Sequence, residues 1–190
     1  VKGITDYDKR ILTAEAKTLR AFYNLLLVTY YGPVTLSQED ISKGETNVRP
    51  VRNTVEEFYT AIIKDLTEAS DELDVQPYGG NYARVCKKTA LGLLARAYAQ
   101  GAGEGLSENG VSYWQRAKDV ADDIINNASA YNVYLYTDVA DLWAQANNRN
   151  NPEALFIVSG RDANDESYNY VNCNIQMDLQ VLGEINTSAR

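Results

Sequence analysis

Apolar residues recur at the three-and-four spacing of a helical face in four separate stretches of this chain. The first stretch covers residues 14–33, and between residues 25 and 28 its apolar side chains run all the way round. Leaving leucine in water costs roughly 25 cal/mol for every Å² of apolar surface. We therefore expect a central helix that other elements cover on more than one side, ending at Gly32 and Pro33. The residues of its main apolar face are Leu19, Phe22, Tyr23, Leu26, Leu27 and Tyr30.

The other three stretches predict further helices with one buried face each. The first helix should begin near Asp6 or Asp8, because acidic side chains suit the positive end of a helix. Thr54 and Glu57 form a capping box that starts the second helix. The expected buried faces are Phe58, Ile62, Leu66, Ala69 and Leu73 in the second helix, Ala90, Leu91, Leu94, Ala95 and Tyr98 in the third (about 86–100), and Trp114, Ala117, Ala121, Ile124 and Ile125 in the fourth (roughly 113–127).

Two short runs, 155–158 and 174–181, favour strands instead, because the second alternates apolar and polar side chains strictly. Residues 138–143 predict a short helix. The third and fourth helices approximate a tetratricopeptide repeat around a glycine-rich insertion at 101–112, which lacks the lysine and spacing of a phosphate-binding loop. We predict an all-α fold over residues 1–190 as a single domain. It should be an irregular tetratricopeptide-like helical repeat bundle with a minor β element near the C-terminus.

Composition narrows the classes of function. The net charge of −8 and the pI near 4.6 argue against nucleic acid as a partner, which requires clustered lysine and arginine. No apolar run approaches the ~20 residues of a membrane span. The chain shows no signal peptide and opens on Val1, so we interpret it as an excised or processed piece of a longer protein.

The residue types that usually carry catalysis are missing or badly placed. The sequence has no histidine, which removes the usual general base and the commonest transition-metal ligand. Cys86 and Cys173 lack metal-binding neighbours; a disulfide between them stays open, and two unpaired core thiols are favoured. The acidic pairs at 56–57 and 122–123 occupy adjacent helical positions about 100° apart, whereas glycoside hydrolysis needs two carboxylates converging on one sugar. We expect no enzyme activity, no metal and no cofactor.

The first helical stretch resembles the signature helix of the SusD/RagB family. The resemblance rests on Ala14-Glu15-Ala16, then Leu19-Arg20-Ala21, then a terminal Tyr31-Gly32. Segments 62–73, 84–98 and 151–157 resemble later parts of the same family in the same order. Two residues depart from its pattern. Pro33 follows the glycine directly, whereas the family places proline about three residues after it, and Cys86 replaces a capping threonine, which implies a weaker start to the third helix.

The resemblance implies a function as well as a fold. Members of the family are surface lipoproteins of glycan-scavenging Gram-negative bacteria, and their helical half consists of irregular tetratricopeptide-type repeats. They present nutrients to a TonB-dependent outer-membrane transporter. The resemblance therefore implies an oligosaccharide or polysaccharide ligand, a transporter barrel as partner, and a cell-surface position at the outer membrane through a lipid anchor absent from this chain. The alternative is a tetratricopeptide-like protein-interaction scaffold without sugar binding.

Aromatic side chains are the candidate ligand contacts, because aromatic rings stack on sugars. Tyr78 and Tyr82 flank a turn in which Asn81 offers an amide for hydrogen bonds, and we regard these three as candidate ligand-binding residues. Trp114 and Trp143 also invite a sugar-stacking interpretation, but both lie on amphipathic patterns that favour packing in the core. The sequence leaves the glycan itself unidentified.

Overall fold

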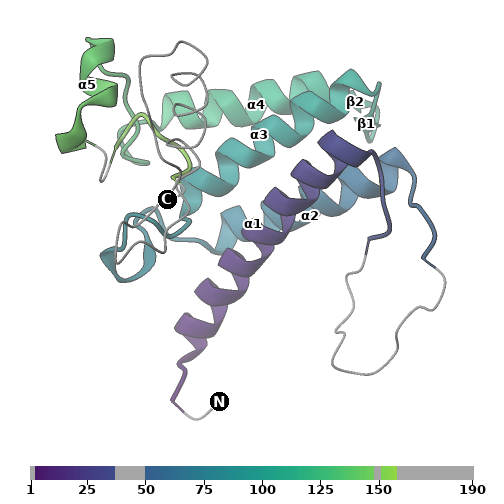
Figure 1. Cartoon of the computed structure of the whole chain (residues 1–190), viewed down its shortest axis with the longest axis horizontal. Coiled ribbons are helices and arrows are strands. Elements are labelled where there is room, and N and C mark those ends of the chain that lie inside the picture. Colours follow the sequence, from purple (N-terminus) through teal and green to yellow (C-terminus); the bar gives the residue numbers. More distant parts are fainter. Residues whose placement is uncertain (1–2, 37–49, 148–150, 158–190) are drawn as a thin grey trace, which may run out of the picture. The chain divides into compact units, whose positions relative to one another are not determined.

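The computed structural model describes residues 3–36, 50–147 and 151–157 (Figure 1). The chain divides into two units, 1–157 and 158–190, and every described residue lies in the first. Its helices are α1 (Asp6–Tyr31), α2 (Val55–Glu72), α3 (Lys87–Gly103), α4 (Tyr113–Asn126) and α5 (Val139–Trp143), with short 3-10 turns η2 (Tyr78–Gly80) and η3 (Gln145–Asn147). The all-α prediction is confirmed, and α5 lies where a short helix was predicted.

The first two helices begin at capping boxes. The Thr5 hydroxyl accepts the Asp8 N–H at 3.1 Å, and the Asp8 carboxylate accepts the Thr5 N–H at the same distance. Thr54 and Glu57 make the same reciprocal pair at α2, at 3.1 and 2.9 Å. Each box satisfies backbone donors that have no partner within the helix, and such a cap contributes about 1 kcal/mol. The predicted start of α1 near Asp6 and the predicted capping box of α2 are confirmed.

The helices pack in sequence order. Each of α1, α2 and α3 packs against the next helix along the chain, so α2 and α3 have neighbours on two sides (Figure 1). Phe58, Ile62 and Leu66 of α2 are wholly buried at the centre of the main core. The predicted buried face of α2 is correct throughout, and that of α3 is correct except that Ala95 is only partly buried.

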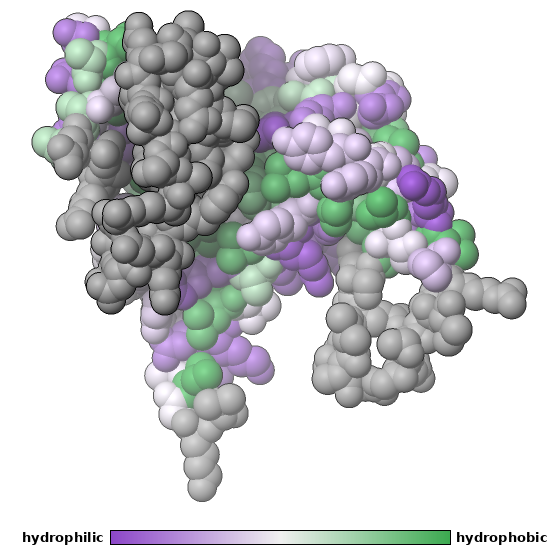
Figure 2. All heavy atoms as spheres, in the orientation of Figure 1, coloured by the Kyte–Doolittle hydropathy of each residue, from purple (hydrophilic) through white to green (hydrophobic). Residues whose placement is uncertain are grey.

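The predicted role of α1 as a central helix is wrong for the part of the chain that the structure describes. The helix lies at one end of the array, where α2 is its main neighbour. The prediction also chose the wrong face: Tyr23 and Tyr30 are 61% and 74% exposed, and Leu19 and Leu27 are exposed too. Hydrophobic residues accordingly interrupt the hydrophilic surface along α1 (Figure 2). The face that is buried consists of Ile11, Ala14, Glu15, Thr18, Ala21 and Leu25.

The predicted face of α4 needs the same kind of correction. Tyr113 and Ile124 are its buried residues, whereas Trp114 and Ile125 are 61% and 69% exposed. The orientation of α4 about its own axis is fixed by Tyr113, whose ring meets that of Tyr98 edge-on at 5.1 Å between centroids. A Cβ atom at Gly101 would lie 2.9 Å from the Tyr113 ring, so only glycine leaves room for it.

The sequence predicted that the first helix ends at Gly32 and Pro33, and α1 does end at Tyr31, directly before them. Gly32 follows α1 with a φ of 68°, in the positive range that favours glycine, although its ψ of −171° is extended.

The sheet of the described residues consists of β1 (Ser107–Glu108) and β2 (Val111–Ser112), an antiparallel pair in the glycine-rich insertion. Residues 155–157 form no strand, contrary to prediction, and the remaining predicted strand positions, 158 and 174–181, lie outside the described residues.

Candidate functional site

A cavity of about 420 Å³ lies beside the first turn of α3. Its walls come from residues within 75–84 between α2 and α3, residues within 86–89, Tyr131 and Asn132 after α4, and residues within 154–157. Side chains and backbone from four separate parts of the chain thus converge on one space. Small-molecule sites are commonly built in this way, with volumes of about 300–1,000 Å³.

Tyr78, in the turn between α2 and α3, is bound to α1 and is not among the residues that line the cavity. The Tyr78 hydroxyl donates to Asp8 Oδ1 at 2.6 Å, and this bond is the main reason that the pKa of Tyr78 is raised. The Arg84 guanidinium lies 4.7 Å from the centre of the Tyr78 ring. One edge and one face of Tyr78 are therefore occupied by other parts of the protein.

The other two candidate residues from the sequence lie differently. Asn81 is exposed, and its Oδ1 accepts the Ala83 N–H at 3.1 Å, so its amide helps to close the turn. Tyr82 is partly buried and lines the cavity. Of the three residues proposed from the sequence, Tyr82 is the one that the structure places at the cavity wall.

Arg84 also lines the cavity, but its charge is balanced by α1. Its Nε donates to Glu15 Oε1 at 2.8 Å, and its Nη2 makes a second bond to Glu15 Oε2. Glu15 is buried, at 8% exposure, on the face of α1 that packs against α2 and α3. This bidentate pair holds the turn in place and leaves little net charge at Arg84.

Lys88 lines the same cavity and has no such partner among the described residues. It stands in the first turn of α3 and is partly buried. Burial lowers the pKa of Lys88, because an ammonium group loses hydration when it is enclosed. Within the described ranges, no carboxylate forms an ion pair with it.

The parts of the wall that come from Tyr131 and from residues 154–157 are held by contacts to three helices. The Tyr131 hydroxyl donates to Asp123 Oδ2 of α4 at 3.0 Å. Thr89 of α3 donates to the Leu155 carbonyl at 2.8 Å, and Phe156 meets Phe22 of α1 edge-on at 4.9 Å between ring centroids. These contacts make the wall at 154–157 a fixed part of the helical unit.

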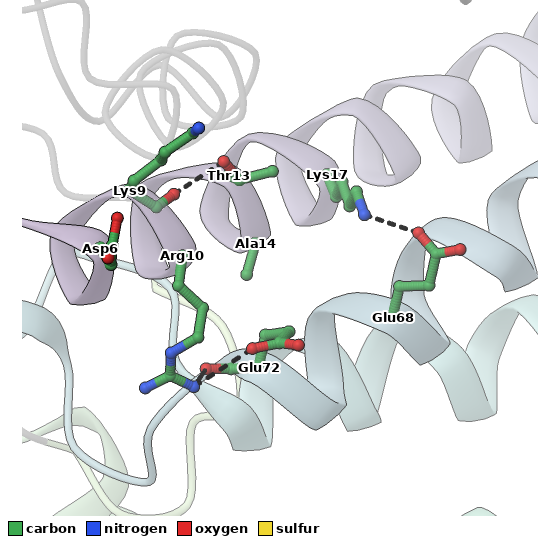
Figure 3. A pocket seen from close by; sticks show the side chains of 8 residues that line it. All are labelled: Asp6, Lys9, Arg10, Thr13, Ala14, Lys17, Glu68 and Glu72. Carbon is green, nitrogen blue, oxygen red and sulfur yellow. Dashed lines mark hydrogen bonds and ion pairs between the residues drawn. The ribbon is translucent and has the colours of Figure 1, made fainter. Parts of the chain in front are cut away.

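A second hollow, of about 290 Å³, lies between α1 and α2 and is lined mainly by charged side chains (Figure 3). Arg10 pairs with Glu72 at 3.3 Å, and Lys17 pairs with Glu68 at 2.6 Å. The bond from Lys17 is the main cause of the lowered pKa of Glu68. Glu68 and Glu72 are each matched by a cation, so much of the hollow is lined by ion pairs between two helices.

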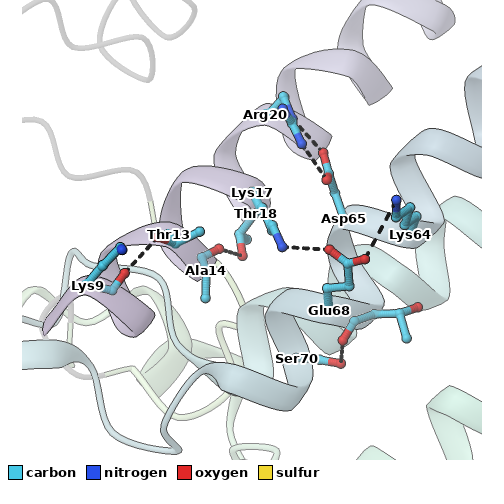
Figure 4. Close-up of polar contacts among 11 residues, drawn as sticks. Lys9, Thr13, Ala14, Lys17, Thr18, Arg20, Lys64, Asp65, Glu68 and Ser70 are labelled. Carbon is cyan, nitrogen blue, oxygen red and sulfur yellow. Dashed lines mark hydrogen bonds and ion pairs between the residues drawn. The ribbon is translucent and has the colours of Figure 1, made fainter. Parts of the chain in front are cut away.

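The same row continues along α1 to Arg20 and Asp65 (Figure 4). Arg20 donates through two nitrogens to the Asp65 carboxylate, at 2.7 and 2.6 Å. The Asp65 side chain is only 5% exposed, so this pair satisfies a buried charge. These contacts fix how α1 lies on α2.

Glu57, Asp122 and Asp123, three of the four acidic residues considered from the sequence, have structural partners. Glu57 caps α2, and the bond from the Thr54 backbone is the main cause of its lowered pKa. Asp122 pairs with Lys118, while Asp123 accepts bonds from Asn127 and Tyr131. None of these contacts sets two carboxylates across a shared space.

The two tryptophans are the clearest departure from the expected core. Trp114 is 61% exposed and Trp143 is 77% exposed, so the prediction that they pack in the core is wrong. Both follow an amphipathic pattern, but α4 is covered mainly by α3, and α5 is a single short turn with no buried residue. The exposed rings leave the sugar-stacking interpretation open.

Other kinds of site find little support in the part of the chain that the structure describes. No cluster of three or more cysteine, aspartate or glutamate side chains there could hold a metal ion. No helix among those residues has the length and apolar character to cross a bilayer. Cys86 is a buried free thiol, as favoured from the sequence, and Cys173 lies outside the described residues.

Comparison with known proteins identifies the family. A family model described as "Starch-binding associating with outer membrane" matches residues 2–99. A SusD-like protein of Bacteroides ovatus is 30% identical over 159 residues, which are 82% of this chain and 27% of that protein. The chain belongs to the SusD-like family.

Solved structures agree with this assignment. A SusD homolog from Bacteroides thetaiotaomicron superposes with a TM-score of 0.67 at 28% identity, covering 84% of this chain and 31% of the homolog. A structure with xylogluco-oligosaccharide gives a TM-score of 0.67 at 27% identity, covering 83% of this chain and 31% of that one. A laminarin-binding SusD-like protein gives 0.64 at 25% identity, with coverages of 78% and 31%. This SusD-like chain therefore spans less than a third of the length of these relatives.

The sequence pattern missed several residues of the cavity. Lys88, Tyr131 and Asn132 carry no local signal, because a lysine in the first turn of a helix is ordinarily a solvated residue. Asn132 does adopt a φ of 52°, a conformation that asparagine tolerates better than most residues. Only the tertiary fold brings these residues to the start of α3.

Proposed function

We propose that this chain is the helical part of a glycan-binding accessory protein that works with a TonB-dependent outer-membrane transporter. The observation that carries the proposal is the match of residues 2–99 to a starch-binding family associated with the outer membrane. Relatives that share its fold include a structure with a xylogluco-oligosaccharide and a laminarin-binding protein. We also propose a position at the cell surface as a lipoprotein, which is supported by the association of the matched family with the outer membrane.

The helical array suits an accessory role. Helices that stack in sequence leave extended surfaces free, so one face can serve as a platform against the transporter while loops on another face meet the ligand. Exposed tryptophans such as Trp143 and the cavity with Tyr82 are the features of this chain that fit sugar contact. Its net negative charge is compatible with neutral sugars and with solubility outside the cell.

We further propose that the protein binds glycans without cleaving them. The carboxylates of the α1–α2 row and the pairs at 56–57 and 122–123 are mostly engaged in ion pairs or caps. Retaining or inverting hydrolysis needs two carboxylates facing each other across a sugar. Release of reducing ends from a polysaccharide by the purified protein, abolished by substitution of one carboxylate, would overturn this proposal.

The alternative function is a tetratricopeptide-like scaffold that binds a protein partner and no sugar. The exposed apolar side chains of α1, among them Leu19, Tyr23 and Tyr30, favour it, because such a face suits a protein contact. Measurements of glycan binding and of protein-partner capture with the complete protein distinguish the two functions.

The decisive experiment is isothermal calorimetry and affinity-gel electrophoresis of the complete protein with a panel of oligosaccharides. We expect at least one glycan to bind the complete protein and to bind this 190-residue chain more weakly or not at all, because relatives are about three times as long. Co-purification of the complete protein with a transporter barrel would support the partner. Absence of binding to every glycan, together with capture of a protein partner, would favour the scaffold. Equal affinity in the short chain, lost on Tyr78→Ala or Tyr82→Ala, would contradict the platform arrangement.

A further inference from the structure

The cavity beside α3 has an unusual charge balance for this protein. Arg84 and Lys88 line it, and no carboxylate does so among the described residues. The whole chain, by contrast, carries a net charge of −8. Because Glu15 already balances Arg84, Lys88 is the cation of this wall that has no matching anion among the residues that the structure describes.

An unmatched, partly buried ammonium group is costly for the folded protein. Its charge has lost part of its hydration, and no carboxylate within the described ranges replaces the lost interaction. The lowered pKa of Lys88 has the same cause. A bound anion would restore a favourable charge interaction at this position, because it would accept a charge-assisted hydrogen bond from the Lys88 ammonium group.

The rest of the wall suits a sugar rather than a bare ion. Tyr82 and Tyr131 contribute aromatic rings, and Gln76 and Asn132 contribute amides that can bond hydroxyl groups. The volume of about 420 Å³ falls in the lower part of the range for small-molecule sites and is far larger than a monatomic ion requires.

We propose that this cavity is a subsite for an acidic sugar, in which the carboxylate of a uronic acid residue accepts a hydrogen bond from the Lys88 ammonium group. The inference rests on the proposed glycan-binding function and adds the chemical class of one recognised residue. The net negative charge of the protein works against non-specific binding of anions, so a preference for an acidic sugar has to come from a local cation.

The test compares trigalacturonic acid with its methyl ester, which keeps the sugar rings and removes the charge. Calorimetry on the complete protein should show about tenfold tighter binding of the acid, since one charge-assisted hydrogen bond is worth at least that factor. The difference should shrink as salt is added. A sulfated oligogalactoside of equal length shows whether the subsite selects the carboxylate or accepts any anion; binding equal to that of the acid would overturn the carboxylate assignment.

Three variants tie the preference to Lys88. Lys88→Gln should bind the acid and the ester equally, while Lys88→Arg should keep a preference for the acid. Lys87→Gln is the matched control, because Lys87 stands next in the same helical turn and does not line the cavity. Far-UV circular dichroism and thermal unfolding establish that each variant folds. In the wild type, the NMR titration of the Lys88 side chain should shift to higher pH when the acid is bound.

The outcomes separate this inference from the proposed function. Equal binding of acid and ester by the wild-type protein, or a preference that survives in Lys88→Gln, would overturn the subsite while leaving glycan binding intact. If the complete protein binds no glycan of the panel, acidic or neutral, both proposals fail. If Lys88→Gln does not fold, the wild-type comparison and the NMR titration still decide the question.

Discussion

The buried face of α1 can be tested with two leucines that lie two positions apart, because truncating each of them should change the free energy of unfolding by a different amount. Leu25 is 2% exposed in the main core, and Leu27 is 37% exposed. Removing a buried leucine costs its transfer free energy plus a cavity term, about 2–5 kcal/mol in total. At Leu27 water fills the vacated space and part of the side chain is already solvated, so the expected cost is about 1 kcal/mol or less.

Urea denaturation of the full chain, followed by far-UV circular dichroism, measures both variants. Leu25→Ala should lower the free energy of unfolding by at least about 2 kcal/mol more than Leu27→Ala, with unchanged m-values. Helix propensity cancels in this comparison, since both changes replace leucine by alanine inside one helix. Equal losses, or a larger loss at Leu27, would show that the face assigned to α1 is wrong and that the face favoured by the sequence is the buried one.

Three more predictions test the packing and the charges. Gly101→Ala should destabilise the chain by about 1–3 kcal/mol, because the new methyl group meets an aromatic ring at 2.9 Å; an unchanged thermal midpoint would contradict this close approach. Arg84→Met should cost about 2–4 kcal/mol in urea denaturation by leaving the buried Glu15 unpaired, and adding Glu15→Gln should recover part of the loss; no recovery would mean that the charge is not the cause. Glu57 and Glu68 have lowered pKa values in the folded state, so the stability that they contribute is complete above the unfolded value of about 4.3 and disappears as pH falls through the folded value. The urea midpoint should therefore be lower at pH 3 than at pH 7, and replacing both by glutamine should reduce that difference.

The buried faces of α2 and α3 could be predicted from the sequence because both helices have neighbours on two sides. Phe58, Ile62 and Leu66 are then the residues that any packing arrangement must cover, and their period is visible without knowing the partner. The fold class could be predicted from the same periodicity. The start of α2 could be predicted because a capping box is a local signal in the sequence.

The cavity could be predicted only in part. Tyr82 was found because the turn around it is a local feature with aromatic and amide side chains. Lys88 was not found, because its environment depends on Tyr131 and on residues 154–157, which are more than forty positions away in the sequence. Contacts of that range are set by tertiary packing, and no spacing rule along the chain reports them.

The failure at α1 has a more specific cause. Its buried face contains two polar residues, Glu15 and Thr18, which a pattern of apolar residues assigns to solvent. Both can be buried because each has a partner: Glu15 binds Arg84, and the Thr18 hydroxyl donates to the Ala14 carbonyl at 2.9 Å. Meanwhile the face with Tyr23 and Tyr30 looks more hydrophobic but stays largely exposed among the described residues, although Phe22 beside it contacts Phe156. Periodicity thus records which face of a helix is apolar, whereas burial at the end of an array is decided by which face can satisfy its polar groups.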